Sequence, residues 1–155
     1  MLHIHLLTHP REQLRKTNTG VLAVDVLDSH CHVITWQRTA ADLTLLDHIK
    51  HQSIALIYPC ENGICLKAEK AFDAFIILDG TWQEAQKMYN QSPYLHGLKK
   101  VKIQASQTSI YTLRRNQKQD GLCTAECVIE ILKSSGHQTY AEHLNTRLIE
   151  RLSNK

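Results

Sequence analysis

Short runs of consecutive apolar residues alternate along this chain with segments whose apolar positions recur every three or four residues. The runs are typical of strands buried on both faces, and the recurring positions of amphipathic helices that cover them. The runs predict strands over residues 2–7, 33–36, 54–57, 75–78 and 101–104. The recurring positions predict helices over residues 21–27, 41–49 and 82–90 and two in the C-terminal third. The alternation predicts one α/β domain with a mostly parallel sheet and helices on both faces.

Local signals set the ends of several elements. Thr81 and Glu84 have the spacing of a capping box, and Asn18 or Thr19 is a candidate cap for the helix over 21–27. Pro10 predicts a loop over residues 8–12 because proline interrupts regular structure. The two C-terminal helices are predicted from two apolar stripes: Cys127, Val128, Ile131 and Leu132, and then Ala141, Leu144, Leu148 and Leu152.

Composition narrows the class of protein. A chain of 155 residues with 43% hydrophobic and 21% charged residues is typical of one globular domain. No apolar run approaches the roughly 20 residues of a membrane span. The first residues lack the basic start of a signal peptide. We therefore expect a cytoplasmic protein without a membrane partner.

Cysteines and histidines are numerous but show no metal-binding spacing. Five cysteines include no Cys-x-x-Cys pair, which disfavours both a disulfide framework and a zinc finger. Ten histidines occur, as in His3/His5, His30/His32 and His48/His51, without the His-Glu-x-x-His spacing of a metal helix. Surface histidines are favoured over a metal site, so no metal is predicted.

The net charge of +3 is small, and its distribution is more informative. Basic residues gather in three places: Arg11, Arg15 and Lys16; Lys99, Lys100 and Lys102; and Arg114, Arg115 and Lys118. Together they would form a phosphate-binding face if folding brings them side by side. On charge alone, solvated side chains explain them equally well.

The segment Asp79-Gly80-Thr81-Trp82 is the strongest chemical signal in the chain. It places a carboxylate at the end of a buried strand and before a helix, which is where α/β sheets bind ligands. Gly80 lets the backbone turn and approach a bound molecule. Tyr58-Pro59 follows another buried strand, which favours one shared pocket. A strand-to-helix turn with a cap and a core tryptophan is the simpler interpretation of the segment alone.

Four segments, taken in order, resemble the signature of one family. They are His9-Pro10-Arg11-Glu12 with Thr17-Asn18-Thr19; Tyr58-Pro59; Asp79-Gly80-Thr81-Trp82; and Arg114-Arg115 with Leu122-Cys123-Thr124-Ala125-Glu126. Over nearly its whole length the chain resembles the DTW-domain family, which includes tRNA-uridine aminocarboxypropyltransferases. That family is similar in fold to the knotted SPOUT-type RNA methyltransferases.

The chain departs from the family pattern at three points. The family often has a cysteine cluster before the first strand, thought to hold a metal, and this sequence has none there. The resemblance then implies a domain over 1–155 without that metal and without part of the RNA-binding surface. Gln117 stands where a proline is common, and Cys123 where a serine is common.

The resemblance implies a fold, a reaction and partners. The fold would be SPOUT-like with a C-terminal knot. S-adenosylmethionine would donate its 3-amino-3-carboxypropyl group to N3 of a uridine in tRNA, and methylthioadenosine would be released. No obligate protein partner is implied. A SPOUT-type RNA methyltransferase and a noncatalytic RNA-binding module are the alternatives.

The resemblance also assigns roles to individual residues. Asp79 would be the catalytic general base that takes the N3 proton. The cofactor-binding residues would be Tyr58, Pro59, Leu78, Gly80, Thr81, Trp82, Arg114, Thr124 and Glu126. The RNA-binding residues would be Arg11, Arg15, Lys16, Arg115 and Lys118. Core packing explains Leu78 and Trp82 equally well, and helix capping is the favoured explanation for Thr124 and Glu126.

Overall fold

A six-stranded sheet forms the centre of the molecule. The computed structural model describes residues 2–15, 18–58, 64–65, 72–102 and 123–153. The strands are β1 (His3–Thr8), β2 (Cys31–Thr35), β3 (Ile54–Ile57), β4 (Ile64–Cys65), β5 (Ala74–Asp79) and β6 (Lys99–Lys102). Their order across the sheet is β2-β1-β5-β3-β6-β4, and every pairing is parallel. This confirms the predicted parallel α/β fold.

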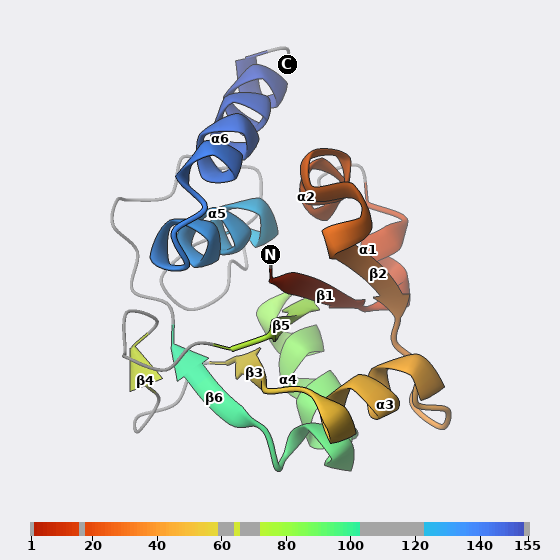
Figure 1. Cartoon of the computed structure of the whole chain (residues 1–155). Helices are drawn as coiled ribbons and strands as arrows, with labels where there is room; N and C mark the ends of the chain where they lie inside the picture. Colours follow the sequence, from red (N-terminus) through yellow and green to blue (C-terminus); the bar gives the residue numbers. More distant parts are fainter. Residues whose placement is uncertain (1, 16–17, 59–63, 66–71, 103–122, 154–155) are drawn as a thin grey trace.

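Helices cover both faces of this sheet (Figure 1). They are α1 (Pro10–Gln13), α2 (Gly20–Leu27), α3 (Leu43–His51), α4 (Trp82–Asn90), α5 (Thr124–Ser134) and α6 (Gln138–Ser153). Two 3₁₀ turns, η1 (Asp28–His30) and η2 (Pro93–Leu95), complete the described elements. Among those residues, no helix combines the length and apolar character needed to cross a membrane.

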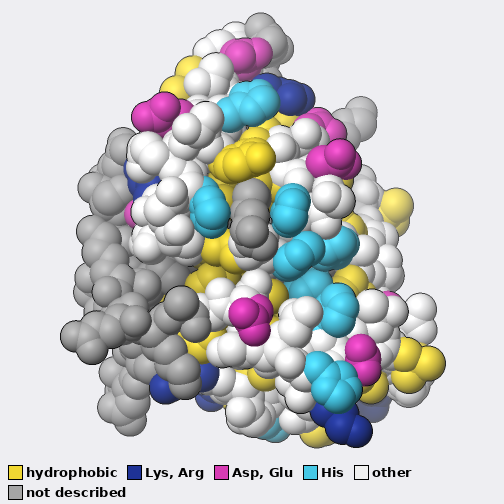
Figure 2. Space-filling view, in the orientation of Figure 1, with side chains coloured by type: hydrophobic (Ala, Val, Ile, Leu, Met, Phe, Trp, Pro, Cys, Tyr) yellow, Lys and Arg dark blue, Asp and Glu magenta, His cyan; other side chains and the backbone are white. Residues whose placement is uncertain are grey.

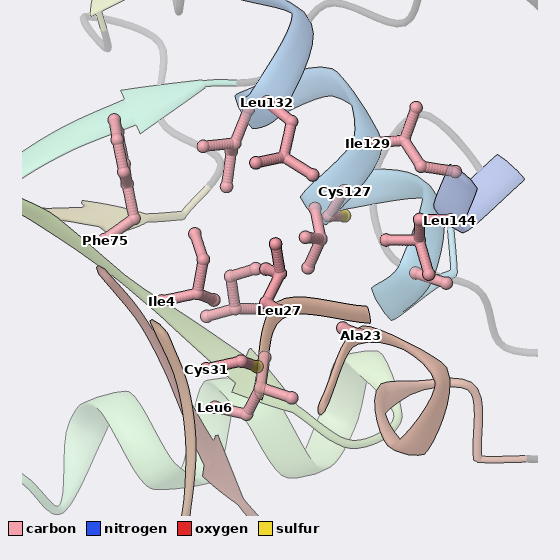
Figure 3. Packing of buried hydrophobic residues seen from close by; sticks show 14 of the residues in the cluster. Ile4, Leu6, Ala23, Leu27, Cys31, Phe75, Cys127, Ile129, Leu132 and Leu144 are labelled. Carbon is pink, nitrogen blue, oxygen red and sulfur yellow. The ribbon is translucent and has the colours of Figure 1, made fainter. Parts of the chain in front are cut away.

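Each face of the sheet has its own hydrophobic core. On one face, side chains such as Ile4, Leu6 and Phe75 pack against α2, α5 and α6 (Figure 3). On the other face, residues such as Leu7 and Ile76 pack against α3, α4 and η2. Successive residues of β1 therefore enter different cores, because neighbouring side chains of a strand point to opposite faces. All six residues of β5 are buried, as expected for a central strand covered on both faces.

One predicted detail is wrong, and one strand was not predicted. Residues 10–13 form a short helix rather than a loop, because Pro10 stands in its first turn, where its missing N–H costs no hydrogen bond. The cap of this helix is the His9 ring, whose Nδ1 accepts a hydrogen bond from the Arg11 N–H at 3.1 Å. The strand β4 was not predicted, because its two residues are too few to show a pattern.

The register of the sheet determines which strand ends meet. Thr8 of β1 lies beside Thr35 of β2 and beside Asp79 of β5. The backbone N–H of His9 donates to the Asp79 carbonyl at 2.9 Å, so the chain leaving β1 stays attached to the end of β5. The segments that follow these parallel strands therefore start at one edge of the sheet.

Candidate active site

Asp79 is the centre of a buried polar cluster at this edge of the sheet. It is the last residue of β5 and only 1% exposed. Its Oδ2 accepts a hydrogen bond from Asn18 Nδ2 at 3.0 Å, and its Oδ1 accepts one from Thr124 Oγ1 at 2.7 Å. These partners are 61 and 45 residues away along the chain. One carboxylate thus joins the segment before α2, the central strand and the start of α5.

Asn18 forms hydrogen bonds to several segments of the chain. Its Oδ1 accepts from the Gly20 N–H at 2.7 Å, and its backbone carbonyl accepts from Arg151 Nη1 in α6 at 2.7 Å. A Cβ added to Gly20 would lie 3.0 Å from Asn18 Oδ1 and 3.1 Å from Asp79 Oδ2. Glycine is therefore required for this close approach. Asn18 was predicted only as a helix cap, although it lies in the Thr17-Asn18-Thr19 signature segment.

The first turn of α5 is anchored by three separate contacts. The Thr124 hydroxyl donates to Asp79, and the Ala125 N–H donates to Thr19 Oγ1 at 3.0 Å. Glu126 Oε1 accepts from the Cys123 N–H at 3.1 Å, which is a capping contact. Burial raises the pKa of the Cys123 thiol to about 12, so this thiol is neutral and a poor nucleophile.

The Thr81–Glu84 capping box is confirmed, and it extends outward into ion pairs. Glu84 N–H donates to Thr81 Oγ1 at 3.2 Å, and the Thr81 N–H donates to Glu84 Oε1 at 2.9 Å. Arg15 then binds both Glu84 oxygens, with Nη1 and Nη2 each at 2.8 Å, and also Glu12 Oε1 at 2.7 Å. The Arg15 guanidinium lowers the pKa of Glu84 to about 2. Gly80 lies against this carboxylate, since an added Cβ would be 3.0 Å from Glu84 Oε1.

Aromatic side chains lie together beside the end of β3. The Tyr58 ring centre is 5.8 Å from that of Trp82 and 4.4 Å from that of Tyr89. The Lys100 Nζ lies 4.6 Å from the Tyr89 ring centre. Two predicted cofactor-binding residues, Tyr58 and Trp82, are thus brought together by the fold. Leu78 is 2% exposed and packs in the core with α4, which is the packing role considered for it.

The remaining predicted residues are placed unequally. Arg11 is exposed on α1, whereas Arg15 is bound to Glu84 and Glu12, so the predicted RNA contact of Arg15 would compete with these carboxylates. The roles assigned to all of these residues remain predictions. The other predicted residues lie outside the described part of the chain: Pro59, Arg114, Lys16, Arg115 and Lys118.

A second polar cluster lies toward the amino ends of the same strands. It consists of five histidines from β1, η1, β2 and α3: His3, His5, His30, His32 and His48. Figure 2 shows histidine side chains gathered on the face over these elements. His3 Nδ1 lies 3.3 Å from His32 Nε2. Within the described residues, no group of three or more potential ligands is arranged to hold a metal ion.

The described geometry defines an α/β protein with a buried carboxylate, held by hydrogen bonds, at the carboxyl edge of a parallel sheet. The model of the DTW domain matches residues 1–153, so the chain belongs to the DTW domain family.

Curated relatives agree with this assignment. The chain is 30% identical to tRNA-uridine aminocarboxypropyltransferase 2 of Drosophila melanogaster, over 83% of this chain and 54% of the relative. It is 24% identical to the Macaca fascicularis protein of the same name, over 97% of this chain and 53% of the relative. It is 25% identical to the Mus musculus protein of that name, over 81% of this chain and 45% of the relative. The chain thus spans about half the length of these relatives. No solved structure matches it.

Proposed function

We propose that this protein is a tRNA-modifying transferase. It transfers the 3-amino-3-carboxypropyl group of S-adenosylmethionine to N3 of a uridine in tRNA and releases methylthioadenosine. The observation that carries the proposal is the match of residues 1–153 to the DTW domain, together with relatives named tRNA-uridine aminocarboxypropyltransferase 2. The buried Asp79 cluster at the carboxyl edge of the sheet supports it, because α/β folds bind ligands at this edge.

The proposed reaction is a substitution at the carbon next to the sulfonium. The uridine N3–H loses its proton to a base, N3 forms a bond to the γ-carbon of the amino-acid chain, and the carbon–sulfur bond breaks. The bond electrons remain on sulfur, which leaves as the neutral thioether of methylthioadenosine. Which sulfonium carbon reacts depends on how the site orients the donor. A positioned carboxylate can act as the base, and the sequence prediction assigns this role to Asp79.

The donor would lie against the ends of β3 and β5 and the first turn of α5. Tyr58 and Trp82 offer apolar ring surface for the adenosine, and such pockets combine apolar walls with few polar groups. In the proposal Gly80 and Thr81 allow close backbone approach, and Thr124 and Glu126 contribute from α5. Arg114 would bind the methionine carboxylate, and the predicted RNA-binding residues would contact tRNA phosphates, which position an RNA without reading its sequence.

Several wider expectations belong to the same proposal. The chain would form one SPOUT-like DTW domain over 1–155 with a C-terminal knot, and it would act in the cytoplasm without an obligate protein partner. The parallel sheet covered on both faces is compatible with this fold.

Product analysis tests the proposed reaction directly. Purified protein is incubated with S-adenosylmethionine and unmodified bulk tRNA, and nucleosides and small molecules are analysed by mass spectrometry. We expect aminocarboxypropyl-uridine and an equal amount of methylthioadenosine. Methylated nucleoside with adenosylhomocysteine would instead indicate an RNA methyltransferase. Binding of tRNA without either product would indicate a noncatalytic RNA-binding module.

A further inference from the structure

We propose that Asn18 and Asp79 form a positioning pair that fixes the first turn of α5 at the carboxyl edge of the sheet. In this proposal Asp79 acts through Thr124 and is not the base that takes the uridine proton. The inference rests on the proposed function for its catalytic readout. Its structural part is that substitutions of Asn18, Asp79 and Thr124 affect stability and donor binding together, and this is measurable without any reaction.

The positions of the Asp79 oxygens argue for this role. One oxygen accepts from Thr124 and the other from Asn18, and these partners are 0% and 7% exposed. Gly20 closes the same side, since even a methyl group there would lie 3.1 Å from Oδ2. A general base must come within hydrogen-bond reach of its proton, directly or through one water. A carboxylate that is 1% exposed and directed at two buried partners is placed to hold those partners.

The element that Asp79 holds belongs to the proposed donor site. Thr124 is the first residue of α5. The next residue, Ala125, donates its backbone N–H to Oγ1 of Thr19, which directly follows Asn18. Asp79 and the Asn18–Thr19 segment therefore both hydrogen-bond to the first turn of α5. Loss of either hydrogen bond would shift that turn. Misplacement of a site residue by about 1 Å can cost about 100-fold in rate.

Exchange of the two side chains separates a positioning role from a base. In Asp79→Asn, one orientation of the amide opposes the Asn18 NH₂ with another NH₂, and the other leaves the Thr124 hydroxyl without an acceptor. In Asn18→Asp, two carboxylates face each other at the 3.0 Å contact. The double variant Asn18→Asp/Asp79→Asn reverses the hydrogen bond: the amide at position 79 donates to the carboxylate at position 18. That carboxylate still accepts from the Gly20 N–H, and the Thr124 hydroxyl keeps its acceptor.

We expect both single variants to lose about 10- to 100-fold in kcat for methylthioadenosine release and to unfold at lower temperature. The double variant should regain most of both losses, although the weak contact of Asn18 Nδ2 with the Glu12 carbonyl at 3.4 Å is absent from it. If the double variant regains its melting temperature but not its activity, a carboxylate is needed at position 79 itself and the positioning proposal is wrong.

Thr124 variants provide the independent test if the exchanged pair does not fold well. Thr124→Val removes the hydroxyl that binds Asp79 but leaves the carboxylate intact. A positioning role predicts a loss about as large as that of Asp79→Asn, with recovery in Thr124→Ser, which keeps the hydroxyl. If Asp79 is the base, the Thr124→Val variant still has the Asp79 carboxylate, with Oδ1 no longer occupied by the Thr124 hydroxyl, and kcat should be retained. A retained kcat would therefore overturn the positioning proposal.

The same samples distinguish this proposal from the proposed function. The Kd for S-adenosylmethionine, by calorimetry, and the melting temperature are measured for the wild type, the two single variants and the double variant. If the wild type shows no transfer to tRNA, the proposed reaction fails, while coupling of Asn18 and Asp79 in Kd and melting temperature still supports the positioning pair. If the two substitutions act additively in Kd and melting temperature, the pair is refuted whatever the reaction is.

Discussion

The two polar clusters on β1 and its neighbours differ in how their side chains are partnered. At the carboxyl ends, Asp79 meets a donor at each oxygen, and Asn18 is used as donor and acceptor. At the amino ends, histidines face other histidines. His5 is 2% exposed, and neither of its ring nitrogens has a hydrogen-bond partner among the described residues. The first cluster fixes the chain in one arrangement, whereas the second contains a buried ring without a hydrogen-bond partner and is sensitive to protonation.

The surroundings of His5 explain this sensitivity. Burial is the main cause that lowers the pKa of His5 to about 4, and the neighbouring His32, His48 and His3 lower it further. Asp42, the residue that caps α3, acts in the opposite direction and raises the pKa of His5. A buried ring without an anionic hydrogen-bond partner resists protonation because the charged form loses its hydration. The pKa of His3 and of His32 is lowered by burial as well.

The largest effect should follow from removing the centre of the carboxyl-end cluster. Asp79→Ala leaves the buried Asn18 amide and Thr124 hydroxyl without their acceptor, which should cost about 2–5 kcal/mol in the free energy of unfolding. Transfer activity should be lost as well. Urea unfolding and methylthioadenosine release measure the two effects. Asp47→Ala is the matched control, since its side chain is 67% exposed, and it should change stability by less than about 0.5 kcal/mol. A stable Asp79→Ala protein would remove the contrast between the clusters.

As the pH falls, protonation of the amino-end cluster should be the first cause of lost folding stability. The pKa of His5 is about 4 in the folded protein, below its ordinary value of 6.5, so the unfolded chain binds the proton more readily. Stability is therefore full above about pH 6.5 and is lost as the pH falls toward 4, with about 2 kcal/mol lost by pH 5. Urea unfolding at pH 7.5 and at pH 5 measures this loss.

A pair of leucine variants assigns this loss to His5. His5→Leu should reduce the pH dependence, whereas His143→Leu should leave it unchanged, because the His143 side chain is exposed on α6. Equal pH dependence in both variants would mean that His5 is not the responsible group.

The contrast between the clusters also shows what a sequence can reveal. The parallel sheet and the capping box follow from local patterns, and Asp79 was singled out because strand-end carboxylates are conspicuous. Asn18 was not assigned to the site, because its partner lies 61 residues away and no local pattern encodes that contact. The histidine cluster was missed for the same reason: His5 and His48 are scattered along the chain, and only the sheet and α3 bring their rings to 5.3 Å.

Close packing at Gly20 provides a second, smaller test of the carboxyl-end cluster. A methyl group there would lie 3.0–3.1 Å from Asn18 Oδ1, Asp79 Oδ2 and Leu6 Cδ1. Gly20→Ala should therefore destabilise the protein by about 1–2 kcal/mol, because buried neighbours must move. Gly97→Ala is the control, since no atom lies within 4 Å of its added Cβ. Thermal unfolding of both variants is the measurement, and equal melting temperatures would show that the cluster is loosely packed.

The smallest expected effect concerns the ion pairs outside the buried cluster. Arg15 binds both oxygens of Glu84 and lowers its pKa to about 2, but the Arg15 side chain is 31% exposed, so solvent weakens the pair. Glu84→Gln, which leaves the Arg15 contact with the buried Glu12 intact, should cost about 1 kcal/mol at pH 7. Because the pKa of Glu84 is lowered by folding, this contribution is present above pH 4.5 and is lost as the pH falls toward 2. The wild type and Glu84→Gln should therefore converge in urea midpoint in strong acid. The direction is the same as for His5, but the pH range is lower. Two separate acid transitions in stability would therefore show that His5 and the Arg15–Glu84 pair titrate independently.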